Sequence, residues 1–105
     1  MTEETAFAPD DIEADFVFRC YDNSMVFAHL FTGDLVFIRS CDDVDDGHIA
    51  AISIGESMVL RRVYHGSGFL ELRAENPEYN PIVIHGQNND TKIIGEAVKA
   101  LCSVF

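Results

Sequence analysis

The chain has 105 residues, of which 48% are hydrophobic, and its 18 acidic and 7 basic side chains give a formal net charge of -11 at pH 7. This length fits one domain with one hydrophobic core and leaves no room for a second domain. The acidic charge opposes binding to a phosphate backbone, and the sequence has no apolar run near the ~18 residues of a membrane span. We therefore expect one domain that neither binds DNA by itself nor enters a membrane.

The first part of the chain is acidic and contains a proline, which predicts a flexible lead-in over residues 1–13 in front of a domain over residues 14–105. It lacks the basic start and apolar core of a signal peptide, so we expect a cytoplasmic protein. Its cysteines, Cys20, Cys41 and Cys102, are odd in number, widely spaced and free of any CxxC pair. This pattern favours reduced thiols, as in the cytoplasm.

Seven short runs rich in β-branched and aromatic residues follow, separated by turn-forming residues. They cover residues 16–18, 35–38, 49–54, 58–63, 69–72, 81–84 and 93–100. The series predicts a mostly β domain, a β-sandwich or partly open barrel of short strands with at most one or two short helices. The one candidate helix spans residues 24–31. Glycine turns at residues 66–68 and 45–47 are expected to close hairpins, since glycine adopts positive φ without steric cost.

Ser24 lies in the stretch of residues 22–25, between the first run and the Gly33-Asp34 turn that leads into the second. A serine at the start of a short helix commonly acts as its N-cap. The same place also suits a nucleophile, because backbone N–H groups there, including that of Asn23, would point at an incoming carbonyl oxygen. The residues alone leave both interpretations open.

Five segments in a fixed order, residues 22–25, 46–52, 60–64, 70–84 and 93–98, carry a family resemblance. Together they resemble the C-terminal domain of LexA-like and phage-type repressors, the serine-lysine self-cleaving peptidase family, over residues 14–100. The resemblance implies a LexA-like fold, Ser24 at the nucleophile position, and residue 61 at the position of the general-base lysine.

Two positions depart from the family pattern. The family places a lysine followed by an arginine between apolar residues, and here the lysine position holds Arg61, followed by Arg62. The family's Gly-Asp-Ser-Met begins here with Asp22-Asn23, so its glycine is lost. A buried lysine can take the serine proton because desolvation lowers its pKa toward ~7–8, whereas a guanidinium stays protonated and only donates. The resemblance therefore implies a serine peptidase fold that lacks its base.

We accordingly expect a C-terminal regulatory and dimerisation domain of a LexA-like or phage-type transcriptional repressor, with a degenerate self-cleavage site. A separate upstream helix-turn-helix module would bind DNA. Residues 93–105 are either an exposed β edge for pairing in a homodimer or a strand of the core. The alternatives are an active self-cleaving peptidase with another base and a stand-alone polymerase-accessory protein. The Ala-Gly and Cys-Gly bonds that the family cuts do not occur in the chain.

Other side chains suggest no further chemistry. The four histidines lack the spacing of a metal site, the aspartates of residues 42–46 fit a solvated acidic turn, and Cys20 ends an apolar strand as a core residue would. We therefore expect neither a metal nor a cofactor. The histidines are His29, His48, His65 and His85.

Overall fold

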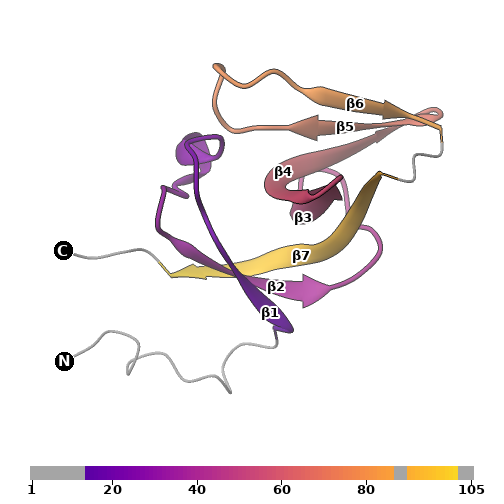
Figure 1. Cartoon of the computed structure of the whole chain (residues 1–105). Coiled ribbons are helices and arrows are strands. Elements are labelled where there is room, and N and C mark those ends of the chain that lie inside the picture. The colour runs from indigo at the N-terminus through magenta and orange to yellow at the C-terminus, as the bar shows by residue number, and fades with distance from the viewer. Residues whose placement is uncertain (1–13, 87–89, 102–105) are drawn as a thin grey trace, which may run out of the picture.

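A computed structural model describes residues 14–86 and 90–101 as one curled antiparallel sheet (Figure 1). In chain order its elements are β1 (Phe16–Arg19), the 3₁₀ turn η3 (Val26–Ala28), β2 (Leu35–Ser40), β3 (Ile49–Ile54), β4 (Ser57–Gly66), β5 (Phe69–Arg73), β6 (Ile82–His85) and β7 (Thr91–Leu101). Each run predicted from the sequence forms a strand, and the mostly β, partly open barrel is confirmed. The expected lead-in and Cys102 lie outside the described residues.

The last strand lies in the middle of the sheet and not at its edge. The strand order is β1-β2-β7-β3-β4-β5-β6, and β7 pairs with β2 on one side and β3 on the other. Figure 1 shows β7 running between them. Of the two alternatives for this segment, the exposed pairing edge is therefore wrong over residues 93–101 and the strand of the core is confirmed, since both backbone edges are used. The outer strands of the described sheet are β1 and β6.

The two glycine turns differ in what they connect. The turn at residues 66–68 closes the β4–β5 hairpin, as predicted, with Gly68 at φ 81°. Gly47 also adopts a positive φ, 85°, but the strands on either side of its connection do not pair with each other. The hairpin predicted at residues 45–47 is therefore wrong, because β7 fills the place between β2 and β3.

Two clusters of buried side chains form the core. Neighbouring residues of β3 alternate between them, because successive side chains of a strand point to opposite faces. Ala51 belongs to the first cluster, and Ala50 and Ile52 belong to the second. The first cluster also contains Met25 and Leu60, the chain neighbours of Ser24 and Arg61. β3 is therefore buried on both faces, and the candidate site borders the first cluster.

Gly95 lets β7 approach β2 closely. A Cβ atom at this position would lie 2.4 Å from Ile38 Cγ2 and 2.8 Å from the Arg39 carbonyl oxygen, which the β2–β7 pairing holds in place. We expect Gly95→Ala to lower the free energy of unfolding by about 1–3 kcal/mol through overpacking. Urea denaturation followed by circular dichroism measures this loss. The control Ser57→Ala, at an exposed position of β4, should stay within about 0.5 kcal/mol. Equal effects of the two variants would contradict the expectation.

Candidate active site

Ser24 lies in the segment between β1 and η3, and its residue is only 3% exposed. Its carbonyl accepts a hydrogen bond from the Glu75 N–H (2.8 Å), and the Glu75 carbonyl accepts one from the Phe27 N–H (2.9 Å). These bonds tie the segment to the chain that follows β5. The turn that contains Ser24 is therefore held at Ser24 and at Phe27 by the backbone of Glu75, although it belongs to no strand.

The helix predicted over residues 24–31 is a single 3₁₀ turn. His29 follows η3 with φ 66°, in the left-handed region, and ends it. The segment is short, so the few hydrogen bonds of a longer helix would not offset the cost of helix nucleation. Met25 holds the N-cap position and makes no side-chain capping bond. The interpretation of Ser24 as an N-cap is therefore wrong.

Arg61 extends from β4 to Ser24. It is 6% exposed, and its Nη1 donates hydrogen bonds to Ser24 Oγ (2.9 Å) and to the Leu60 carbonyl (2.8 Å). Its guanidinium carbon lies 5.7 Å from the centre of the Tyr79 ring, a distance that permits a cation–π contact. The roles implied by the family resemblance require that Ser24 and residue 61 meet, and this contact confirms that they do. Their catalytic roles stay a prediction.

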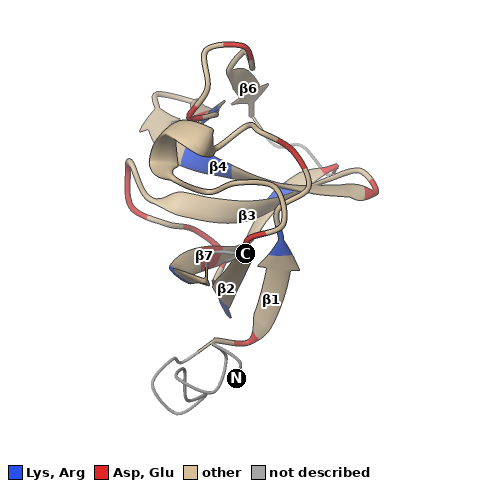
Figure 2. Ribbon diagram, turned by 90° about the vertical axis from the view of Figure 1, so that its left-hand side faces the viewer, with Lys and Arg blue, Asp and Glu red and all other residues tan. Residues whose placement is uncertain are grey.

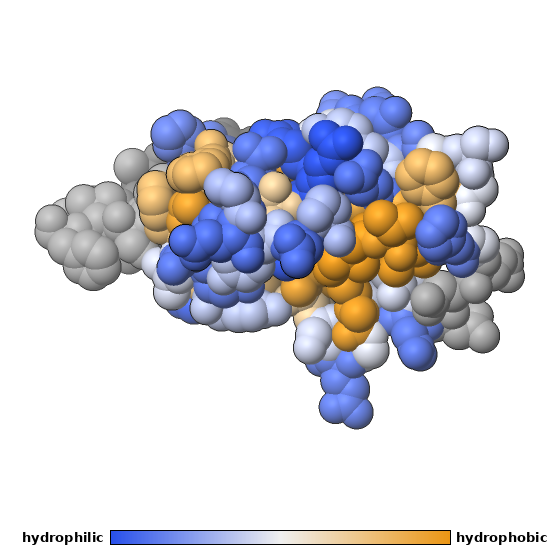
Figure 3. Space-filling view, turned by 90° about the horizontal axis from the view of Figure 1, so that it is seen from above, coloured by the Kyte–Doolittle hydropathy of each residue, from blue (hydrophilic) through white to orange (hydrophobic). Residues whose placement is uncertain are grey.

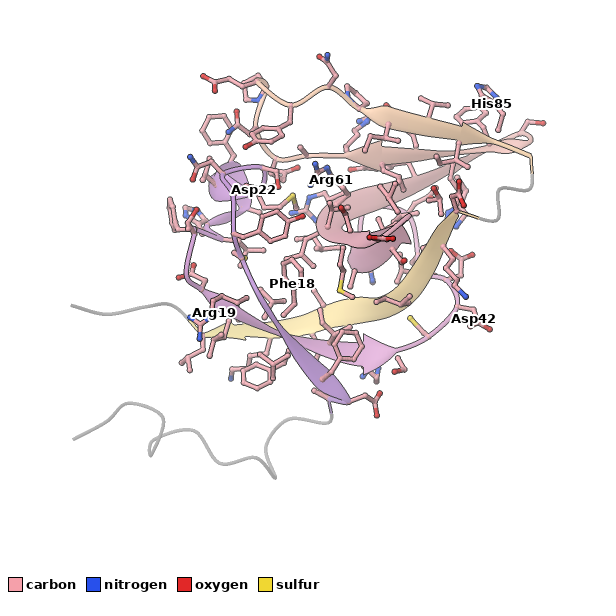
Figure 4. The ribbon with its side chains drawn as sticks, in the orientation of Figure 1. Phe18, Arg19, Asp22, Asp42, Arg61 and His85 are labelled. Carbon is pink, nitrogen blue, oxygen red and sulfur yellow. The ribbon has the colours of Figure 1, made fainter. Side chains whose placement is uncertain are left out.

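Asp22 is the member of this site that the sequence analysis missed. Its Oδ1 accepts hydrogen bonds from Ser24 Oγ (2.7 Å) and from the Ser24 N–H (3.0 Å). Figure 4 shows Asp22 on the segment after β1, close to Arg61 on β4. An aspartate that accepts from the backbone two residues further on forms an Asx turn. The Asp-x-Ser spacing was therefore a usable signal.

Together the three side chains orient the Ser24 hydroxyl. Its hydrogen points to Asp22, and one of its lone pairs accepts the hydrogen of Arg61. The guanidinium has no acceptor, and a carboxylate is a far weaker base than a neutral amine. The arrangement positions a serine hydroxyl but offers it no strong base.

The backbone donors near Ser24 are less open than predicted. The N–H of Ser24 is turned toward Asp22, so it does not face a substrate oxygen in this conformation. The carbonyl of Asn23 accepts from Asn76 Nδ2 (2.8 Å), and its side-chain oxygen accepts from Thr32 Oγ1 (3.3 Å). A role of the Asn23 N–H as an oxyanion donor stays a prediction.

A small pocket adjoins Ser24 and Asp22, with Tyr21 and Cys20 in its wall. Burial raises the pKa of the Cys20 thiol to about 11, and Asp34 and Asp22 add to the shift. Cys20 is therefore protonated near neutral pH, and its predicted place in the core is confirmed. Burial also raises the pKa of Tyr21, whose hydroxyl donates to the Met58 carbonyl (2.6 Å).

His65 contacts two aspartates that are distant in the sequence, which its spacing did not predict. Its ring nitrogens bond to Asp46 and Asp43 in the β2–β3 connection. The side chains of these aspartates are still 59% and 60% exposed, so the predicted solvated acidic turn is confirmed. The hydrogen bond to Asp46, followed by that to Asp43, raises the pKa of His65. Over residues 14–86 and 90–101, no group of three or more His, Cys, Asp or Glu side chains is arranged to hold a metal ion.

The pKa of His65 should therefore exceed its usual value in an NMR titration of the imidazole. Because the folded-state pKa is raised, any stabilisation from these contacts is fully present below the ordinary pKa and is lost as pH rises through the raised pKa. The double variant Asp43→Asn/Asp46→Asn should return the pKa toward about 6.5. Asp42→Asn, at an exposed neighbouring position, should leave it unchanged. An unshifted His65 in the parent protein would show that the contacts do not persist in solution.

The chain is similar in sequence to a known family and to several curated proteins. The Peptidase S24-like family model matches residues 2–98. A LexA repressor of Thermosipho melanesiensis is 36% identical over 83 residues, which cover 79% of this chain and 41% of that protein. A LexA repressor of Dechloromonas aromatica is 31% identical over 96 residues, covering 91% and 46%, respectively. The chain therefore spans less than half the length of these curated relatives.

Proposed function

The chain belongs to the Peptidase S24-like family, and on that basis we propose that it is the C-terminal regulatory and dimerisation domain of a LexA-like or phage-type transcriptional repressor with a degenerate self-cleavage site. The two curated relatives named above are LexA repressors, and the matched regions form less than half of each. A role as one domain of a longer repressor agrees with both facts.

The contact between Arg61 Nη1 and Ser24 Oγ carries the proposal that the site is degenerate. The resemblance assigns residue 61 to the general base, and here Arg61 Nη1 lies 2.9 Å from Ser24 Oγ. The guanidinium of Arg61 cannot accept the serine proton. The direct test is whether Arg61→Lys creates cleavage that depends on Ser24.

A second candidate function is an active self-cleaving serine peptidase. The observation in its favour is the 2.7 Å hydrogen bond from Ser24 Oγ to Asp22, whose carboxylate accepts the hydrogen of this hydroxyl. Hydrolysis by the unmodified protein that is lost in both Ser24→Ala and Asp22→Asn would favour this candidate. A parent protein at background rate, with or without Ser24, favours the degenerate site.

For its partners we propose a homodimer that reaches DNA through a separate upstream helix-turn-helix module. Figure 2 shows acidic residues spread over several loops and the basic residues as isolated segments. With a net charge of -11, this surface is poorly suited to contact phosphates. We propose a cytoplasmic location because a transcriptional repressor has to reach DNA, and the relatives named above are LexA repressors. The described part of the chain contains no helix that is long and apolar enough to cross a membrane.

The domain should sediment as a dimer at micromolar concentration and should not retard duplex DNA at moderate salt. A dimer formed through a sheet edge would use β1 or β6, where Val17 and Val83 are 49% and 46% exposed. Apolar surface gathers on one face of the molecule (Figure 3). If the contact is formed by β1, Val17→Lys should produce monomers, and if it is formed by β6, Val83→Lys should do so, because lysine opposes edge pairing. A parent protein that is monomeric throughout would contradict the dimer, and tight DNA binding would contradict the charge argument.

A further inference from the structure

The buried cation of Arg61 is connected to a carboxylate through the hydroxyl of Ser24. Arg61 Nη1 donates to Ser24 Oγ, which in turn donates to Asp22 Oδ1. Arg61 Nε is buried and has no hydrogen-bond partner among the residues that the structure describes. A buried guanidinium that is only partly satisfied is costly, so the bridge to a negative charge offsets part of that cost.

We propose that Asp22 is a positioning residue that keeps the Ser24 hydroxyl unreactive, in addition to the missing base. We call this effect the lock on reactivity. The carboxylate of Asp22 holds the hydroxyl hydrogen and the N–H of Ser24 away from a substrate, and it pairs through Ser24 Oγ with the charge of Arg61. The lock on reactivity rests on the proposed function, that is, on Ser24 occupying a former nucleophile position. The charge bridge can be tested without that premise.

The two departures from the family pattern meet at one atom. Asp22 stands where the family has glycine, Arg61 stands where it has lysine, and both contact Ser24 Oγ. A glycine at residue 22 would remove the acceptor of both Ser24 donors, and with it the carboxylate that is linked to the guanidinium through Ser24 Oγ. Each departure is therefore better tolerated in the presence of the other.

Asp22 also acts on any base placed at residue 61. An opposite charge nearby favours the charged form of an amine, so the carboxylate would keep the lysine of Arg61→Lys protonated to higher pH. It would also compete with that lysine for the hydroxyl hydrogen. Removing the carboxylate should therefore increase the reactivity of Ser24 and lower the pH at which it appears.

An alkyl fluorophosphonate tests this directly. In the labelling step Ser24 Oγ attacks phosphorus, fluoride leaves, and the neutral base takes the hydroxyl proton; intact-protein mass follows the adduct. We expect Arg61→Lys/Asp22→Gly to label about 10-fold faster than Arg61→Lys, with an alkaline midpoint about one pH unit lower. The parent protein and Asp22→Gly should stay at background.

Two further variants separate charge from geometry in the Arg61→Lys background. Asp22→Asn keeps an oxygen acceptor but removes the charge, so it should lower the midpoint with a smaller gain in rate. Asp42→Asn removes the same charge from an exposed position and should change neither quantity. If Asp22→Gly alters neither rate nor midpoint in that background, the lock on reactivity is overturned.

A double-mutant cycle on stability tests the bridge independently. Asp22→Gly and Arg61→Met should each shift the urea midpoint of unfolding, and the double variant should shift it by less than the sum. Additive shifts would overturn the charge bridge. If no variant labels at Ser24 while the cycle shows coupling, the nucleophile ancestry in the proposed function fails and the bridge stands.

Discussion

Arg61→Lys should cleave a peptide containing an Ala-Gly bond, at a rate about 10²-fold above the parent protein under alkaline conditions. The reason is the burial of residue 61, which is 6% exposed and whose side chain reaches Ser24 Oγ. A lysine there loses its proton more readily than in water and can then accept that of the hydroxyl. Product formation measured by mass spectrometry from neutral to alkaline pH should rise as the lysine is neutralised.

Two controls make this result specific. Ser24→Ala added to Arg61→Lys should abolish cleavage, since the nucleophile is gone, and Arg39→Lys should confer none, because Arg39 lies on the exposed end of β2. Inactivity of Arg61→Lys together with activity of Arg61→Lys/Asp22→Gly would assign the remaining block to Asp22. Ser24-dependent cleavage by the parent protein would contradict the degenerate site and would show that the chain is an active peptidase.

The strands were predictable because each is encoded by a local run of β-branched and aromatic residues. The meeting of Ser24 and Arg61 was predictable for a different reason, the order of motifs that resembles the family, since the spacing of the two residues alone says nothing about their distance. Local pattern thus predicted the elements, and the resemblance predicted which of them meet at the site.

The position of β7 could not be predicted in the same way. Its run is equally compatible with an edge and with a central strand, and its partners, β2 and β3, lie far away in the sequence. The contact of His65 with Asp46, 19 residues earlier, likewise depends on how the β2–β3 connection folds back. The hydrogen bonds that Asp22 accepts from Ser24 are a local case, for which the Asp-x-Ser spacing was a signal, but that Arg61 shares the same hydroxyl depends on the fold.

The second cluster of the core should be essential to this fold, and Ile52→Ala tests it. Ile52 is fully buried on β3, opposite Val59 of β4 and Ile93 of β7. Truncation removes most of the side chain and leaves a cavity between strands whose pairing restricts their collapse. We expect the free energy of unfolding to fall by about 2–5 kcal/mol, a large part of the roughly 5–15 kcal/mol of a small domain.

The same variant separates stability from chemistry. Ser24 adjoins Met25 of the first cluster, whereas Ile52 belongs to the second. Ile52→Ala added to Arg61→Lys should therefore lower the urea midpoint of unfolding. The alkaline midpoint of cleavage should stay the same while the protein is folded. Val83→Ala, on the outer strand β6 and 46% exposed, should cost far less stability. A loss no greater than that of Val83→Ala would show that the second cluster contributes little. A shift in the alkaline midpoint would show that it helps to set the environment of residue 61.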